Sequence, residues 1–115
     1  MSHVLLVEDD PVIRAMGSAL LESAGHCVIE AETGARALLL LREVKFDVLI
    51  TDVCMPGMNG LELIQTIRAA GSGIRIVALS GGSQVLRSAK AFGADLVLQK
   101  PVAPSALLAA LETGS

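Results

Sequence analysis

The chain has 115 residues and a net charge of −3, and 52% of its residues are apolar although only 2% are aromatic. This length fits one compact domain, which we place over residues 1–115, with enough apolar residues for an aliphatic core. The chain has no Trp, no Tyr and no block of basic residues, so we expect no direct binding of nucleic acid. No apolar run is long enough to cross a membrane, and the amino terminus lacks a signal-peptide pattern. Two cysteines without a CxxC pair favour a reduced, cytoplasmic setting.

Short apolar runs alternate with amphipathic segments along the chain. The predicted strands cover residues 3–7, 27–30, 47–51, 74–79 and 95–99, and the predicted helices cover residues 11–24, 35–43, 61–70, 84–92 and 104–112. Asp10 followed by Pro11 is typical of a helix N-cap and first turn, and Cys27 is expected to pack as a small buried residue. Five β–α units in series predict an α/β fold, with a five-stranded parallel sheet and helices on both faces.

Polar side chains follow four of the predicted strands. Glu8 and Asp9 follow the first strand, Asp52 the third, Ser80 the fourth and Lys100 the fifth. The carboxyl ends of parallel strands meet at one edge of a sheet, where ligands bind at the point of strand-order reversal. Crowded carboxylates raise one another's pKa, so this edge needs a compensating cation such as Mg²⁺ or a lysine. A carboxylate surrounded by a hard cation, an ammonium and a hydroxyl favours phosphoryl transfer to that carboxylate.

Together and in this order, the motifs resemble the receiver domain of bacterial two-component response regulators. The similar segments are residues 6–11, 47–60, 79–81, 93–95 and 100–101, within a match that runs from Val4 to about Leu111. The resemblance implies a chemotaxis-regulator-like, flavodoxin-like (βα)5 fold with strand order 2-1-3-4-5. It also implies a cis peptide between Lys100 and Pro101.

The resemblance implies a role for each polar residue at this edge. Asp52 would be the phosphoacceptor, taking a phosphoryl group from the phosphohistidine of a sensor histidine kinase or phosphotransfer protein, or from acetyl phosphate. Lys100 and Ser80 would hold the phosphoryl oxygens. Mg²⁺ would be bound by Glu8, Asp9, Asp52 and the backbone carbonyl of Cys54.

The same resemblance implies a phosphorylation-dependent signalling protein. It would catalyse its own phosphorylation and dephosphorylation, and it would not be an enzyme that turns over a separate substrate. Its change of conformation would control an output domain or protein. A weak homodimer is compatible with this function, and no membrane contact is expected.

Two alternatives are left open. Val97 stands three residues before Lys100, where the family usually has an aromatic residue, so burial of a ring cannot be the switch in this chain. The segment between Ser80 and Lys100 is also shorter than usual. These departures favour, as an alternative, a pseudo-receiver that acts as a protein-binding or dimerisation module with weak or no phosphorylation switching. A flavodoxin-like enzyme that binds FMN fits the fold, but the acids after the first strand would repel a phosphate.

Overall fold

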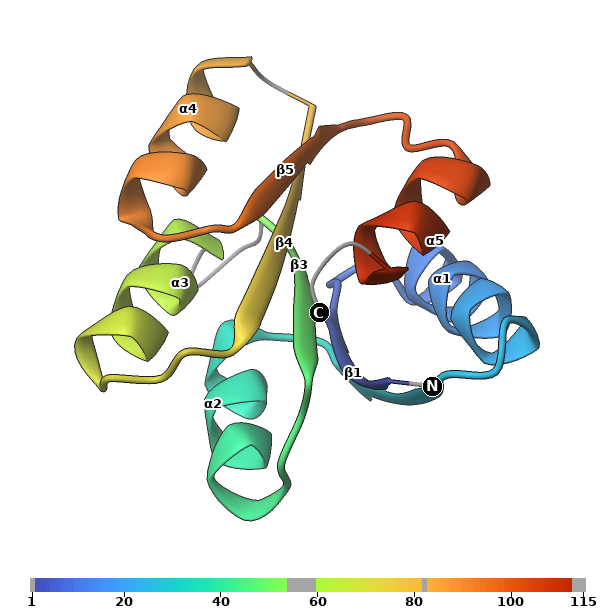
Figure 1. The fold of residues 1–115 in the computed structure, drawn as a ribbon, viewed down its shortest axis with the longest axis horizontal. Coiled ribbons are helices and arrows are strands. Elements are labelled where there is room, and N and C mark those ends of the chain that lie inside the picture. Colours follow the sequence, from blue (N-terminus) through green and yellow to red (C-terminus); the bar gives the residue numbers. More distant parts are fainter. Residues whose placement is uncertain (1, 54–59, 82, 113–115) are drawn as a thin grey trace.

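The computed structural model describes residues 2–53, 60–81 and 83–112, and it has a central sheet between two layers of helices (Figure 1). The strands are β1 (His3–Val7), β2 (Cys27–Ala31), β3 (Val48–Asp52), β4 (Arg75–Ser80) and β5 (Leu96–Gln99). The helices are α1 (Pro11–Ser23), α2 (Gly34–Glu43), α3 (Gly60–Ala69), α4 (Ser83–Phe92) and α5 (Pro104–Glu112). All strand pairs are parallel in the order β2-β1-β3-β4-β5, which confirms the predicted fold class and strand order.

The helix ends follow the local sequence signals. Asp10 caps α1, and its carboxylate accepts hydrogen bonds from the N–H groups of Val12 and Ile13 at 2.8 and 3.1 Å. These bonds satisfy two of the N–H groups that a helix start leaves without a partner. Gly25 follows the end of α1 with a φ of 94°, a conformation that favours glycine. Within the described ranges, no helix is both long and apolar enough to cross a membrane.

Helices cover both faces of the sheet. α2, α3 and α4 lie over one face, and α1 and α5 lie over the other (Figure 1). Side chains of β3 alternate between the two cores, with Leu49 packed on the α2–α4 side and Val48 and Ile50 on the α1–α5 side. Because β3 is buried on both faces, its carboxyl end is a rigid support for the residue that ends it, Asp52.

The structure contradicts the predicted burial of Cys27 on the edge strand β2. Cys27 was predicted to be buried but is exposed, and Ile29 is 40% exposed. β2 lies at the end of the sheet and pairs with β1 alone, so the helices cover its first residues less completely than those of β3. An apolar run does not reveal whether its strand will be central or at the edge.

Arg68 links the segments that lead into β4 and β5, at the end of the strands opposite to Asp52. Its guanidinium donates hydrogen bonds of 3.0, 2.7 and 3.0 Å to the carbonyls of Ser72, Ile74 and Gly93. It also forms an ion pair of 2.9 Å with Asp95. These contacts hold the carboxyl end of α3 against the two loops.

Candidate functional site

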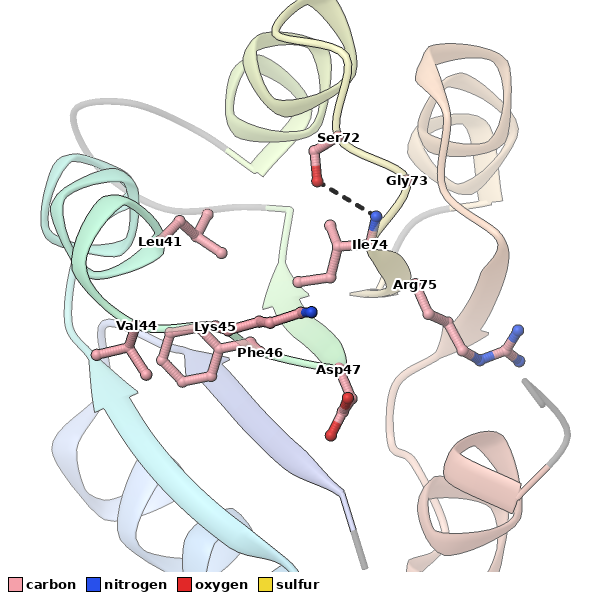
Figure 2. Close-up of a pocket in the computed structure, with 9 residues that line it drawn as sticks. All are labelled: Leu41, Val44, Lys45, Phe46, Asp47, Ser72, Gly73, Ile74 and Arg75. Atoms are coloured by element: carbon pink, nitrogen blue, oxygen red, sulfur yellow. Dashed lines mark hydrogen bonds between the residues drawn. The ribbon is translucent and has the colours of Figure 1, made fainter.

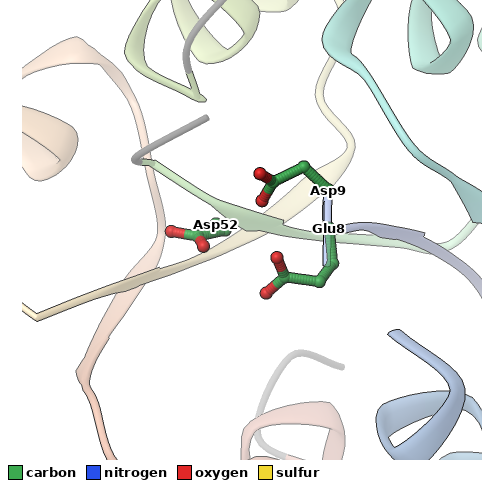
Figure 3. A group of neighbouring side chains, drawn as sticks. All are labelled: Glu8, Asp9 and Asp52. Atoms are coloured by element: carbon green, nitrogen blue, oxygen red, sulfur yellow. The ribbon is translucent and has the colours of Figure 1, made fainter. Parts of the chain in front are cut away.

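Three carboxylates meet at the carboxyl ends of β1 and β3 (Figure 3). Glu8 and Asp9 directly follow β1, and Asp52 is the last residue of β3. Val7 pairs with Thr51 across the two adjacent strands, so the register brings the next residues level with each other. One carboxylate oxygen from each of Glu8, Asp9 and Asp52 lies within 4.8 Å of the others. The structure thus brings together the three carboxylates that the sequence placed at one edge.

This donor set suits a small hard cation. Carboxylate oxygens are the ligands that Mg²⁺ prefers, and a site formed by one or two carboxylates with water is typical of it. Glu8 and Asp52 are 4% and 5% exposed, so two of the three charges are largely withdrawn from water. A bound cation would offset that cost. The fourth predicted ligand, the carbonyl of Cys54, lies outside the described residues.

Lys100 brings a positive charge to the same edge. Its ammonium donates a hydrogen bond of 2.7 Å to Asp52 Oδ2 and lies 3.5 Å from Glu8 Oε1. Burial alone would lower the pKa of Lys100, but the hydrogen bond and charge of Asp52, together with Glu8, outweigh burial and raise it. The ammonium therefore stays charged at neutral pH. The peptide bond between Lys100 and Pro101 is cis, which confirms the expectation from the sequence.

Glu8 is held through both its side chain and its backbone. Its N–H donates to the carbonyl of Ala31 at 3.0 Å, and its carboxylate accepts a bond of 3.1 Å from the N–H of Asp10. Burial raises the pKa of Glu8, with the neighbouring carboxyl groups of Asp9 and Asp52 acting in the same direction; the hydrogen bond from Asp10 and the charge of Lys100 oppose this shift. The negative charge of Glu8 is therefore costly when no cation is bound.

We expect Glu8→Gln to stabilise the metal-free protein at neutral pH. Because the folded state holds the Glu8 proton more tightly than the unfolded state, wild-type stability falls as pH rises from the ordinary value of 4.5 through the raised pKa. A neutral amide avoids this loss. In EDTA, the thermal midpoint should exceed that of wild type at neutral pH, and the difference should shrink in acid. Glu22→Gln, at an exposed position on α1, is the control. A lower midpoint for Glu8→Gln at neutral pH would contradict the argument.

Ser80 lies on β4, the strand next to β3, and Val97 lies on β5, one strand further from Asp52. Ser80 ends β4, is fully buried, and its carbonyl accepts a bond of 2.8 Å from the N–H of Lys100. Val97 on β5 is half-buried and packs against the core on the α2–α4 side. A cavity of about 410 Å³ adjoins it, lined by Val97, Ala91 and the cationic residues Arg87 and Lys90. The position that is usually aromatic thus borders a hollow in this chain.

Arg14 is a further neighbour of the site and was not among the predicted site residues. It lies one helical turn after the cap residue Asp10, and its guanidinium donates a bond of 2.8 Å to the carbonyl of Glu8. The same guanidinium pairs with Glu30 on β2 at 3.0 Å. The available signal was positional: an arginine in the first turns of a helix that begins at an acidic loop can reach back to that loop.

A second cavity, of about 460 Å³, lies at the other end of the strands, where β3 and β4 begin (Figure 2). Leu41, Phe46 and Ile74 supply apolar surface, and Lys45 and Asp47 supply charge. The carboxylate of Asp47 accepts a hydrogen bond of 2.8 Å from the N–H of His3 and so helps to hold β1 beside β3. Among the described residues, the cluster of carboxylates lies at the Asp52 edge, so we place the chemistry there.

Comparisons with known proteins show the family of the chain. The model of the response regulator receiver domain matches residues 4–112. The solved structure of chemotaxis protein CheY4 from Vibrio cholerae is 36% identical, with a TM-score of 0.90 and 97% of each chain covered. The chain belongs to the receiver domain family of two-component response regulators, which are signalling domains.

Longer relatives carry the same domain. The sensor histidine kinase AruS of Pseudomonas aeruginosa is 40% identical over 115 residues, which cover 95% of this chain and 12% of the kinase. The DNA-binding response regulator MtrA of Mycolicibacterium smegmatis is 32% identical over 109 residues, which cover 93% of this chain and 47% of MtrA. The chain therefore spans less than half the length of these two relatives.

Proposed function

We propose that residues 1–115 form a single cytoplasmic receiver domain that accepts a phosphoryl group on Asp52, in a Mg²⁺-dependent reaction, from a histidine kinase or phosphotransfer protein. The observation that carries this proposal is the contact of 2.7 Å between Lys100 and the Asp52 carboxylate, beside two further carboxylates. Asp52 thus belongs to a potential cation site and also contacts an ammonium group. A nucleophile that attacks a phosphoryl group needs both, because negative charge gathers from both reactants.

The proposed reaction assigns a step to each residue of the site. An oxygen of Asp52 attacks the phosphorus in line with the leaving group, and the bond from phosphorus to the donor nitrogen or oxygen breaks. Lys100 passes from the carboxylate to a phosphoryl oxygen and stabilises the charge that develops there. Ser80 donates its hydroxyl to a second phosphoryl oxygen. Mg²⁺, held by Glu8, Asp9 and Asp52 with the carbonyl of Cys54, would supply charge neutralisation at the phosphoryl group.

The product is an aspartyl phosphate that stays on the chain until water hydrolyses it. The chain is therefore a switch with its own phosphorylation state and does not turn over a separate substrate. The contacts among Glu8, Asp52 and Lys100 support this function over a pure binding module, because burying carboxylates costs free energy and a phosphoryl-transfer site explains why they are held together beside a lysine. Control of an output domain or protein would follow from the altered charge at this edge.

A titration with Mg²⁺ and beryllofluoride tests the proposal, because beryllofluoride on an aspartate oxygen imitates a phosphoryl group. In NMR spectra of the wild-type chain, the amide signals around Asp52, Ser80 and Lys100 should shift when both reagents are present. In Asp52→Asn, the shifts that depend on beryllofluoride should disappear. The proposal fails if beryllofluoride leaves the wild-type spectrum unchanged or shifts the variant in the same way.

An exposed apolar surface on α1 supports docking of the phosphodonor protein. Val12, Ile13 and Met16 are 66%, 49% and 68% exposed, and they begin two residues after the cap residue Asp10. A donor protein must bring its phosphohistidine to Asp52 at this same edge. Apolar side chains in water beside a reaction centre are typical of a protein contact. We therefore place the donor's contact surface on these three residues.

We expect Met16→Glu to weaken transfer from a donor protein that phosphorylates the wild-type chain, by about tenfold, because a charge would enter an apolar interface. Phosphorylation by acetyl phosphate needs no docking and should be unchanged. Leu39→Glu is the matched control, since Leu39 is 49% exposed on α2 at the other face of the sheet. Equal rates for Met16→Glu and wild type with the protein donor would refute this docking surface.

A further inference from the structure

We infer that Arg14 is a positioning residue for the proposed cation site, which orients the peptide between Glu8 and Asp9 so that both carboxylates face Asp52. This inference rests on the proposed function, because it concerns how the same edge binds Mg²⁺. The backbone of Arg14 is held in place by the helix α1. Its backbone N–H donates to the carbonyl of Asp10 at 2.9 Å, within the helix that Asp10 caps.

The guanidinium of Arg14 joins three segments of the chain. Nη1 donates to the carbonyl of Glu8 at 2.8 Å and lies 3.5 Å from the carbonyl of Asp9. Nε pairs with a carboxylate oxygen of Glu30 at 3.0 Å. The side chain of Arg14 is 17% exposed, so the group is mostly shielded from water. One planar group thus connects β2, the loop after β1, and α1.

These contacts fix the direction in which the chain leaves Glu8. The N–H of Glu8 is already bonded to the carbonyl of Ala31 at 3.0 Å, and Arg14 holds the carbonyl of Glu8. Because a peptide unit is planar, a fixed Glu8 carbonyl also fixes the position of the Asp9 backbone that follows. Asp9 is exposed and depends on this backbone for its place beside Glu8 and Asp52. Without Arg14, the Glu8 carbonyl would lose this restraint, and we expect the carboxylate of Asp9 to be held less firmly beside Glu8 and Asp52.

Charge and geometry make opposite predictions for Arg14. Its positive charge repels a second cation, so if charge were its only effect, removal of Arg14 would tighten Mg²⁺ binding. If Arg14 instead orients the ligands, its removal weakens Mg²⁺ binding despite the lost repulsion. The sign of the change in affinity therefore separates the two effects. A general loss of stability would not by itself choose between them.

The test measures the Mg²⁺ dissociation constant by NMR titration and the thermal midpoint in EDTA for the same proteins. Arg14→Gln removes the charge and the contact with the Glu8 carbonyl, and we expect Mg²⁺ to bind about tenfold more weakly. Arg14→Lys keeps the charge but lacks the fork that reaches two acceptors at once, so it should weaken binding to a similar extent. Arg68→Lys should lower the thermal midpoint and leave the Mg²⁺ dissociation constant unchanged.

A second pair of variants keeps the test decisive if a change at Arg14 prevents folding. Glu30→Gln and Glu30→Ala alter the charge equally, but only glutamine keeps an oxygen for Nε of Arg14. Glu30 lies at the exposed edge strand, with 42% of its side chain accessible, so both proteins should fold. We expect Glu30→Ala to bind Mg²⁺ more weakly than Glu30→Gln. Equal dissociation constants for this pair would overturn the inference.

The outcomes separate this inference from the function on which it rests. Mg²⁺ binding by wild type together with equal or tighter binding by folded Arg14→Gln overturns the role of Arg14 and leaves the proposed function intact. No Mg²⁺ binding by wild type overturns both. Weaker binding by both Arg14 variants, with unchanged binding by Arg68→Lys, supports the positioning role.

Discussion

Replacing Lys100 with methionine is expected to slow phosphorylation of Asp52 by acetyl phosphate on the order of a hundredfold, while Mg²⁺ binds more tightly. The ammonium lies 2.7 Å from Asp52 Oδ2, where it can move to a phosphoryl oxygen as charge develops. Methionine keeps the length of the side chain but supplies no charge. The same loss removes a cation that competes with Mg²⁺ for Asp52 and Glu8, so affinity and rate should change in opposite directions.

The measurements for Lys100→Met are the rate of phosphorylation at saturating Mg²⁺ and the Mg²⁺ dissociation constant. Saturating Mg²⁺ ensures that the rate does not merely report metal occupancy. Lys45→Met is the control, because Lys45 is exposed at the other end of the strands (Figure 2). An unchanged rate in Lys100→Met, or weaker Mg²⁺ binding, would contradict the role given to the lysine.

Gly60→Ala is expected to lower the free energy of unfolding by about 3 kcal/mol, near the upper end of the usual cost of overpacking. Gly60 begins α3, and a Cβ atom there would lie 2.4 Å from the carbonyl oxygen of Asp52 and 2.5 Å from Cα of Val53. Both neighbours are backbone atoms, so no side-chain rotation relieves the contact. The shift would also move Asp52, so phosphorylation should slow as well.

Urea denaturation followed by circular dichroism measures this change, a suitable choice because the chain has no Trp and no Tyr. Gly73→Ala is the matched control, since a Cβ atom at Gly73 meets nothing within 4 Å and the residue has no positive φ. It should unfold at nearly the wild-type urea concentration. If Gly60→Ala matched that midpoint, the close approach of α3 to the end of β3 would not have the stated cost.

The sequence predicted the fold well because strands and helices differ in their apolar periodicity. Each observed element begins and ends within one residue of its predicted range. The exposure of Cys27 was not predicted, because apolar periodicity does not show whether a strand lies in the centre of the sheet or at its edge. That position depends on pairing between distant segments. The edge position of β2 could be expected only from the resemblance to a family.

The candidate site was predictable in part for a related reason. Glu8, Asp9, Asp52 and Lys100 follow parallel strands, so topology alone brings them to one edge. Arg14 and Gly60 were not predicted from the sequence, because both act on backbone atoms. Arg14 binds the carbonyl of Glu8, and Gly60 leaves room for the carbonyl of Asp52. A sequence shows which side chains are present, but it does not show which backbone groups they will meet.

Val97 stands where the family usually has an aromatic residue, so the change of conformation after phosphorylation must differ from a switch based on ring burial. The side chain packs in the core beside a cavity lined in part by Arg87 and Lys90 on α4. A valine has no ring whose burial could report the state of Ser80. We therefore expect the response to Asp52 phosphorylation to pass through shifts of the backbone near Ser80 and Lys100, which share a hydrogen bond of 2.8 Å.

Mass spectrometry of the chain after incubation with acetyl phosphate and Mg²⁺ tests directly whether Asp52 accepts a phosphoryl group. We predict the addition of one phosphoryl group, which peptide analysis after borohydride trapping assigns to Asp52. The addition should be absent in EDTA and in Asp52→Asn. An unchanged mass of the wild-type chain, or a phosphoryl group that persists in Asp52→Asn, would contradict the central claim that Asp52 is the phosphoacceptor.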